Sequence, residues 1–178
     1  DLGCGAGDLS GRLRARGVDV VAADAGALFA AAGGVQCDED RLPFADGAFD
    51  LIVSAGALDT VNDLPGALTL ARRALRPDGL FLAAFLGAGS LPALRAAMHA
   101  ADEAEGRGAA ARLHPQIDVR AAGDLLARAG FALPVADCER LVVRYGTLAR
   151  LVGDLRTMAA TNILAAPVRP LGRAGLAA

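Results

Sequence analysis

The chain has 178 residues, of which 54% are hydrophobic, so it is long enough for one compact domain with a buried core. Its formal net charge of -2 argues against nucleic acid as a dedicated partner. The longest apolar run, Leu80 to Leu86, is too short for a transmembrane helix and no signal-peptide pattern is present, so we expect no transmembrane segment and a cytoplasmic location.

The first half of the chain alternates helix and strand patterns. Short β-branched and aromatic runs predict buried strands at Val18–Ala23, Val35–Cys37, Phe49–Ser54 and Leu80–Leu86. Patterns of helical spacing predict helices over 8–16, 25–32 and Leu64–Leu75. Gly17 is expected to end the first of these helices and Asp63 to cap the last. A loop over 38–48 and a turn over 77–79 separate the later strands. This alternation is typical of an α/β fold with a parallel sheet and right-handed crossovers.

The second half is expected to add helices over Ser90–Glu105, 120–129 and about 147–159. We expect Ser90 to cap the first of them. Two strand-like runs, 131–137 and 140–145, predict an antiparallel pair at the sheet edge. The tail from Pro167 onward is rich in Pro, Gly and Ala and is a candidate for disorder. We therefore predict one domain over residues 1–160 and a tail over 161–178.

The residues that carry chemistry begin with the glycine-rich stretch from Asp1 to Gly7, DLGCGAG. Glycines at alternate positions let a backbone turn tightly and approach a ligand closely. The helix that follows would point its N-terminus at a carboxylate or phosphate. The dinucleotide fingerprint GxGxxG is absent, because its third glycine would fall on Asp8 or Ser10. Binding of NAD is therefore disfavoured.

Acidic residues follow two of the predicted strands. Asp24 at a strand end can accept from both ribose hydroxyls, although a turn acid or helix cap has the same pattern. Asp38, after the next strand, can accept from an adenine amino group, with Leu42 and Phe44 as apolar cover. The alternative is a set of solvated acids in a loop. Three cysteines without CxxC spacing and two scattered histidines indicate neither a disulfide framework nor a metal site.

Taken in order, DLGCGAG, VVAAD, CDEDRLPFADGAFDLIVS and LRPDGLFLAAF resemble class I S-adenosylmethionine-dependent methyltransferases over roughly residues 1–86. The resemblance implies a mostly parallel, seven-stranded Rossmann-like sheet with helices on both faces, whose first strand would lie just before Asp1. It implies S-adenosyl-L-methionine as the cofactor. By resemblance, Asp24 binds the ribose, and Asp38 and Glu39 meet the adenine. Ser54 and Ala55 flank the sulfonium. The methionine end is lined by Asp1, Gly3, Gly5 and Gly7.

A narrower resemblance rests on four segments, LDTVNDLPGAL, LRPDGLFLAAFLGAGSLPALRAAM, LHPQIDVRAAGDLLARAGF and DLRTMAATN. These segments look like a subgroup that contains the malonyl-acyl-carrier-protein methyltransferase of biotin synthesis and a complex I assembly factor that hydroxylates an arginine of its partner. The sequence looks closer to the second, through His114-Pro115 and the segment from Asp154 to Asn162. That subgroup often has His where Asp59 stands here.

Methyl transfer from a sulfonium needs little acid–base machinery, so the sequence identifies no catalytic residue. Asp59, Arg95 and His114 are the polar candidates for contact with substrate, each with a structural or solvated role as its alternative. The leading function is methyl transfer to a small molecule, an acyl thioester or a protein. The alternatives are arginine hydroxylation in the same cofactor pocket and a non-catalytic assembly factor. The acceptor cannot be deduced from the sequence.

Overall fold

The computed structural model describes residues 1–30, 33–106, 108, 110–165 and 170–177. It contains two compact units. The first comprises Asp1–Leu86 with Ile117–Asp137, and the second comprises Gly87–Gln116 with Cys138–Ala178. All strands among the described residues belong to the first unit.

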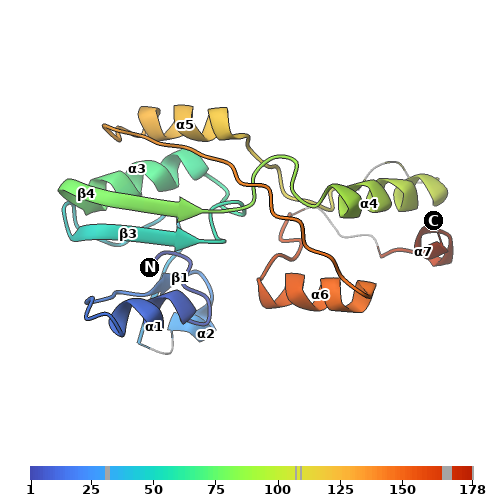
Figure 1. The fold of residues 1–178 in the computed structure, drawn as a ribbon, viewed down its shortest axis with the longest axis horizontal. Coiled ribbons are helices and arrows are strands. Elements are labelled where there is room, and N and C mark those ends of the chain that lie inside the picture. Colours follow the sequence, from blue (N-terminus) through green and yellow to red (C-terminus); the bar gives the residue numbers. More distant parts are fainter. Residues whose placement is uncertain (31–32, 107, 109, 166–169, 178) are drawn as a thin grey trace. The chain divides into compact units, whose positions relative to one another are not determined.

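The first unit alternates helices and strands (Figure 1). In chain order its elements are α1 (Asp8–Arg14), β1 (Ala23–Asp24), α2 (Ala27–Ala30), β2 (Val35–Gln36), β3 (Phe49–Ala55), α3 (Leu64–Ala74), β4 (Leu75–Ala84) and α5 (Val119–Arg128). The order confirms the alternation predicted from the sequence up to β4. The predicted cap of α3 is also confirmed, because the Asp63 carboxylate accepts from the backbone N–H of Gly66 at 2.9 Å.

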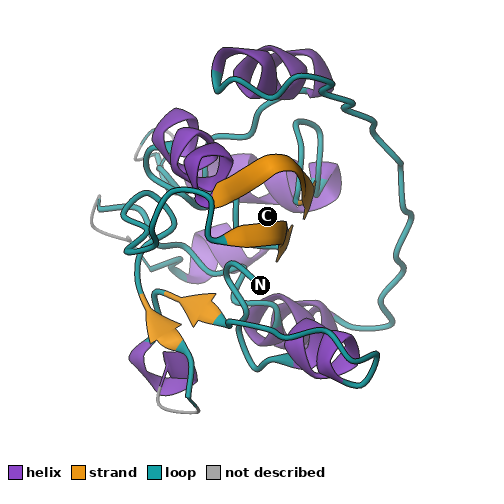
Figure 2. Ribbon diagram, turned by 90° about the vertical axis from the view of Figure 1, so that its left-hand side faces the viewer, coloured by secondary structure: helices purple, strands orange, loops and turns teal. Residues whose placement is uncertain are grey.

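The strands form two parallel pairs, β1 with β2 and β3 with β4, drawn in orange in Figure 2. Leu2 makes one parallel bridge to Ala23 of β1 and another to Ser54 of β3, so it links the two strand pairs. The described residues thus contain four strands, not the seven that the family resemblance implied. Of the strand predicted at Val18–Ala23, only Ala23 lies in β1, although the carbonyls of Val21 and Ala22 accept hydrogen bonds from the backbone nitrogens of Asp1 and Val35.

The start of β4 differs from the prediction of a turn followed by a strand. Leu75 pairs with Phe49 and Leu80 pairs with Leu51, so four residues of β4 lie opposite the single residue Asp50 and three of them are extra. Asp78, inside the bulge, has φ +61°. A Cβ on Gly79 would lie 2.9 Å from the carbonyl oxygen of Arg76, so the bulge needs glycine there. The turn predicted over 77–79 therefore lies within strand β4, as part of this bulge.

The core of the first unit lies between the strands and α3. Its buried members are Leu2, Ala23, Cys37, Ile52, Ala71, Ala74 and Leu75. Phe131, which follows α5, stacks on Phe81 of β4 with ring centroids 5.2 Å apart. α5 also lies against α3. Helix α3 thus buries its apolar face, including Leu68 and Ala71, and packs against β4.

The second unit contains α4 (Pro92–Ala104), α6 (Leu148–Thr157) and α7 (Arg173–Ala177). The prediction that Ser90 caps α4 is wrong. Leu91 occupies the cap position with φ +54° and no side chain caps the helix, because Pro92 at the first turn sets the start. The tail from Pro167 onward was a candidate for disorder, but its residues Arg173–Ala177 form α7. Residues 167–169 and 178 of this tail lie outside the described residues.

The antiparallel strand pair predicted over 131–137 and 140–145 is absent from the structure. Both segments make no strand hydrogen bonds, and Leu133 and Leu141 are 92% and 76% exposed. β-branched composition favours a strand only when a neighbouring strand and a buried face are available, and these segments have neither.

Candidate functional site

The glycine-rich loop precedes α1 and turns through three left-handed glycines. Gly3, Gly5 and Gly7 have φ values of +70°, +50° and +85°, a region that favours glycine over other residues. A Cβ on Gly5 or Gly7 would meet no atom within 4 Å, whereas one on Gly3 would lie 2.2 Å from the Cβ of Ala57. The loop is therefore tightly packed at Gly3 and open at Gly5 and Gly7.

Asp24, the last residue of β1, ties this loop to the strand end. Its Oδ2 accepts from the backbone N–H of Gly5 at 2.8 Å, and its Oδ1 accepts from the N–H of Gly26 at 2.7 Å. Each carboxylate oxygen keeps a further lone pair, because a carboxylate offers about four acceptor positions. The half-buried Asp24 can therefore hold the loop and still accept hydrogen bonds from a ligand.

Asp1 and Ser10 make a second tie that the sequence analysis did not foresee. The hydroxyl of Ser10 on α1 donates to Asp1 Oδ2 at 2.6 Å, and Ser10 is fully buried. A serine at a buried helix position needs such a partner, because an unpaired buried hydroxyl is costly. The signal in the sequence is a small polar residue on the otherwise apolar face of α1.

Glu39 also reaches the loop. A Cβ on Gly3 would lie 3.4 Å from Glu39 Oε1. Partial burial raises the pKa of Glu39. A hydrogen bond from its own backbone opposes this rise, and the negative charges of Asp24, Asp38 and Asp40 add to it. Asp38, by contrast, is exposed. The structure thus brings Asp24 and Glu39 to the glycine loop and leaves Asp38 at the surface.

Two free thiols accompany these acids. The backbone N–H of Cys4 donates to Ala23, and that of Cys37 donates to the carbonyl of Asp24 at 3.1 Å. Burial raises the pKa of both thiols, and the charge of Asp24 raises them further. Both therefore stay protonated at neutral pH, which disfavours a nucleophilic role.

Ser54, near the end of β3, has a side chain that is 3% exposed, and its Oγ has no hydrogen-bond partner among the described residues. It pairs with Leu2, the second residue of the glycine-rich stretch. The half-buried Asp59 lies five residues further along the chain, in the segment that follows β3. Ser54 is therefore linked through the backbone to the glycine loop.

The other two substrate candidates belong to the second unit. Arg95 of α4 donates to Gln116 Oε1 at 3.1 Å, and both Arg95 and His114 are half-buried. The first unit contains all the remaining predicted site residues. The structure therefore gathers the predicted cofactor residues but does not place Arg95 or His114 among them.

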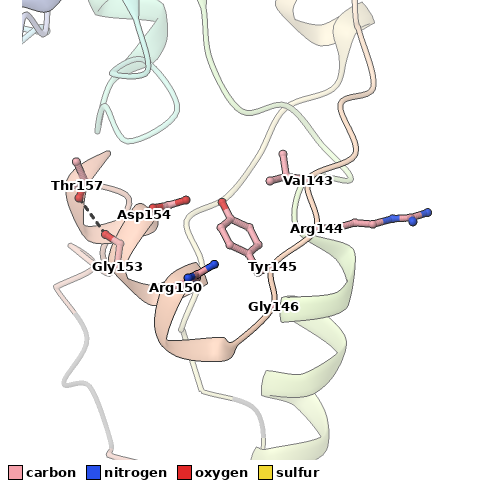
Figure 3. Close-up of a pocket in the computed structure, with 8 residues that line it drawn as sticks. All are labelled: Val143, Arg144, Tyr145, Gly146, Arg150, Gly153, Asp154 and Thr157. Carbon is pink, nitrogen blue, oxygen red and sulfur yellow. Dashed lines mark hydrogen bonds between the residues drawn. The ribbon is translucent and has the colours of Figure 1, made fainter.

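The second unit contains an open hollow of about 660 Å³ that the sequence analysis did not predict (Figure 3). It is formed by α6 and the extended segment before it. Its lining residues are Val143, Arg144, Tyr145, Gly146, Arg150, Gly153, Asp154 and Thr157. A signal was present in the sequence, since Arg150 and Asp154 stand four residues apart and share one helix face.

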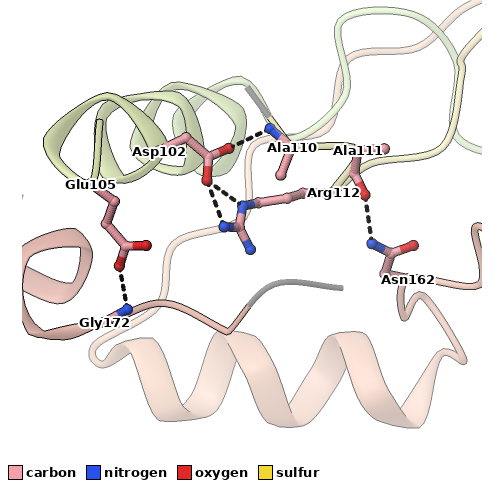
Figure 4. A network of polar contacts seen from close by, with 7 residues as sticks. All are labelled: Asp102, Glu105, Ala110, Ala111, Arg112, Asn162 and Gly172. Carbon is pink, nitrogen blue, oxygen red and sulfur yellow. Dashed lines mark hydrogen bonds and ion pairs between the residues drawn. The ribbon is translucent and has the colours of Figure 1, made fainter. Parts of the chain in front are cut away.

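A second polar cluster in this unit is structural (Figure 4). Asp102 of α4 accepts from Arg112 Nε and from the backbone N–H of Ala110, both at 2.9 Å, and its side chain is 7% exposed. Hydrogen bonding from Arg112 and from Ala110 lowers the pKa of Asp102. Glu105 accepts from the backbone N–H of Gly172, which ties α4 to the segment before α7. These groups satisfy one another.

Within the described residues, no three His, Cys, Asp or Glu side chains are grouped so that they could hold a metal ion. None of the helices in the described part of the chain has the length and apolar character needed to span a bilayer.

Comparison with known proteins places this geometry in context. Residues 1–83 match the family described as a methyltransferase domain. The arginine-hydroxylase NDUFAF5 of Danio rerio is 35% identical over 128 residues, which are 72% of this chain and 40% of that protein. The malonyl-[acyl-carrier protein] O-methyltransferase of Laribacter hongkongensis is 38% identical over 145 residues, which are 81% of this chain and 47% of that protein. The chain therefore spans less than half the length of these two relatives.

Among solved structures, the S-adenosylmethionine dependent methyltransferase from Mesorhizobium loti superposes with a TM-score of 0.54 at 23% identity, covering 88% of this chain and 82% of that one. This likeness confirms the class I methyltransferase fold. The sequence matches confirm the resemblance drawn from the motifs.

Proposed function

We propose that this chain, whose residues 1–83 match a methyltransferase domain, binds S-adenosylmethionine at the glycine loop and transfers its methyl group to an acceptor. The observation that carries this proposal is the meeting of Gly5, Asp24 and Glu39 at the carboxyl end of β1. Ligands of open parallel α/β sheets bind outside the carboxyl ends of the strands.

The glycine loop is suited to the methionine end of this cofactor. Gly5 and Gly7 have open space where a side chain would stand, so a ligand can approach their backbone closely. Gly3 holds the loop against Ala57, and the hydrogen bond from Ser10 fixes the carboxylate of Asp1. We assign Asp1, Gly3, Gly5 and Gly7 to this end of the cofactor.

The acidic residues would bind the nucleoside end of the cofactor. Asp24 would accept from the ribose hydroxyls with the lone pairs that Gly5 and Gly26 leave free. Glu39 and Asp38 would meet the adenine. Half-burial disfavours the charged form of Glu39, which suits contact with a neutral ring, and the exposed Asp38 would accept from its amino group at the rim.

Ser54 would lie beside the reacting centre, since its buried hydroxyl has no hydrogen-bond partner among the residues that the structure describes. Bound S-adenosylmethionine supplies a methyl group already activated by the sulfonium, so alignment of the acceptor nucleophile provides much of the rate. Asp59, Arg95 and His114 are proposed to orient the acceptor. We propose further that residues 1–160 act as one domain in the cytoplasm, and that the bridges of Leu2 to Ala23 and Ser54 mark the central strand of a seven-stranded sheet.

A second candidate is hydroxylation of an arginine in a protein partner. It is favoured by the 35% identity to a relative named as an arginine-hydroxylase. A third is a cofactor-binding assembly factor without turnover. Both would use the same cofactor residues, so the site described here does not separate them.

Product analysis separates the three functions. The full-length protein is incubated with S-adenosylmethionine and with small-molecule, acyl-thioester and protein acceptors, and the acceptors are examined by mass spectrometry. We expect one added CH₂ on the acceptor and release of S-adenosylhomocysteine. Addition of one oxygen atom would support hydroxylation instead, and stable partner binding without modification would support the assembly factor. Asp24→Ala should abolish the product, and Asp19→Ala, which removes an exposed acid outside the site, should leave it unchanged.

A further inference from the structure

The hollow in the second unit is independent of the glycine loop and has the size of a small-molecule site. One wall is α6, which carries Arg150 and Asp154, and the opposite wall is the extended segment with Val143 and Tyr145 (Figure 3). All of these residues belong to the same unit. A ligand in the hollow would therefore touch one helix and one extended segment.

Arg150 and Asp154 carry opposite charges, but their side chains do not form an ion pair with each other. They stand four residues apart on one face of α6, where an ion pair would be expected. Neither side chain forms an ion pair with any described residue. Arg150 uses its backbone N–H, bonded to Thr147, but its guanidinium has no hydrogen-bond partner in the described part of the chain. The hollow thus offers a guanidinium without a partner among the described residues and, about one helical turn away, a carboxylate that interacts with the neutral hydroxyl of Tyr145.

The remaining polar groups of the hollow add little binding capacity. The hydroxyl of Thr157 already donates to the carbonyl of Gly153 at 3.1 Å. Burial raises the pKa of Tyr145, and the carboxylate of Asp154 raises it further as acceptor and as negative charge. The Tyr145 hydroxyl therefore stays neutral and points its hydrogen toward Asp154. The Arg144 guanidinium extends away from the Tyr145 ring in Figure 3.

This arrangement selects among small ligands by charge. A guanidinium fork binds a carboxylate or a phosphate, but the carboxylate of Asp154 on the same wall repels the second charge of a phosphate. A ligand with one carboxylate and one neighbouring ammonium satisfies both side chains. The aromatic ring of Tyr145 and the side chain of Val143 add an apolar surface for the rest of the ligand.

We propose that the hollow between α6 and Val143–Tyr145 is a binding site for a zwitterionic α-amino acid with an apolar side chain, its carboxylate on Arg150 and its ammonium on Asp154. This site does not depend on methyl transfer and makes no use of the glycine loop.

Titration calorimetry of the full-length protein with L-leucine tests the proposal. Two analogues complete the set: 4-methylpentanoate, which lacks the ammonium, and isopentylamine, which lacks the carboxylate. We expect L-leucine to bind and both analogues to bind at least about tenfold more weakly, because each loses one charge-assisted contact. If 4-methylpentanoate binds as well as L-leucine, the site is a simple anion site and the proposal is wrong.

Variants locate the binding. Arg150→Gln and Asp154→Asn should each weaken L-leucine about tenfold or more, and Arg150→Lys should restore part of the loss. Arg156→Gln is the matched control, since Arg156 is an exposed arginine of α6 that does not line the hollow, and it should leave the binding of L-leucine unchanged. Arg150, Asp154 and Arg156 are all exposed, so circular dichroism suffices to check that the four variants fold. Absence of binding to the wild type, or binding that survives Arg150→Gln, would overturn the proposal.

Discussion

The two units are stabilised in different ways. The first unit holds the cluster of buried apolar residues around Leu2, Ile52 and Leu75, and its parallel strands share backbone hydrogen bonds. The second unit has no strand among its described residues, and its buried residues include Asp102, which Arg112 neutralises. The carboxylates differ in the same way, because burial raises the pKa of Glu39 whereas Arg112 lowers that of Asp102. Apolar packing thus stabilises the first unit, whereas hydrogen bonds and an ion pair contribute more to the second.

The largest effect is expected at Gly3, where packing is tightest. Gly3→Ala places a Cβ 2.2 Å from that of Ala57 and keeps a left-handed φ. The two penalties together should lower the free energy of unfolding by about 2–5 kcal/mol. Gly5→Ala has the same backbone strain without the overlap, so it should cost about 1–2 kcal/mol. Urea denaturation measures the free energy of unfolding of both variants. Equal losses in the two variants would show that Ala57 does not pack tightly against Gly3.

In the second unit, we expect loss of the Asp102 charge to be the most damaging single change. Asp102→Asn leaves the guanidinium of Arg112, whose side chain is only 12% exposed, without its counter-charge. The melting temperature should fall clearly, while an exposed control, Asp124→Asn, should leave it unchanged. A melting temperature that does not move would mean that this pair contributes nothing to the unit.

The same carboxylate predicts a loss of stability in acid. The pKa of Asp102 is lowered in the folded chain, so the unfolded chain takes up a proton first, near pH 4. The stability from this group is complete above about pH 4 and is lost as the pH falls through the lower, folded-state pKa. The difference in free energy of unfolding between wild type and Asp102→Asn should therefore shrink below pH 4. A constant difference would contradict the assigned direction.

Glu39 should show the smallest effect, with the opposite sign. Its pKa is raised on folding, so its charged form costs stability at neutral pH and that cost disappears as the pH falls through the folded-state pKa. Glu39→Gln should raise the melting temperature slightly at pH 7 and have no such effect once Glu39 is protonated. Asp38→Asn, at an exposed neighbour, should be neutral at both pH values.

The sequence predicted the first unit well because its signals are local. Asp63 before Pro65, and glycine after α1, specify helix ends without reference to the rest of the chain. The β-branched runs around Ile52 and Phe81 became strands because each has a parallel partner. Asp24 was predicted from its position at the end of a strand, now β1, whereas Glu39 was predicted from the family resemblance alone.

The remaining features depend on contacts distant in sequence. Leu133 and Leu141 have strand composition but no neighbouring strand, so composition alone misled. Helical spacing marks Ser10 as a polar residue on α1, but its partner Asp1 is known only from the structure. Likewise, the spacing of Arg150 and Asp154 marks one face of α6, but the hollow also needs the extended segment around Tyr145.

Calorimetric titration of the full-length protein with S-adenosylhomocysteine tests the central claim most directly. We predict one binding event, weakened about tenfold or more by Asp24→Ala and unaffected by Asp19→Ala. The acid at the end of β1 would then serve the cofactor as well as the loop. No heat and no thermal shift with folded, full-length protein would contradict the assignment of the glycine loop as the cofactor site.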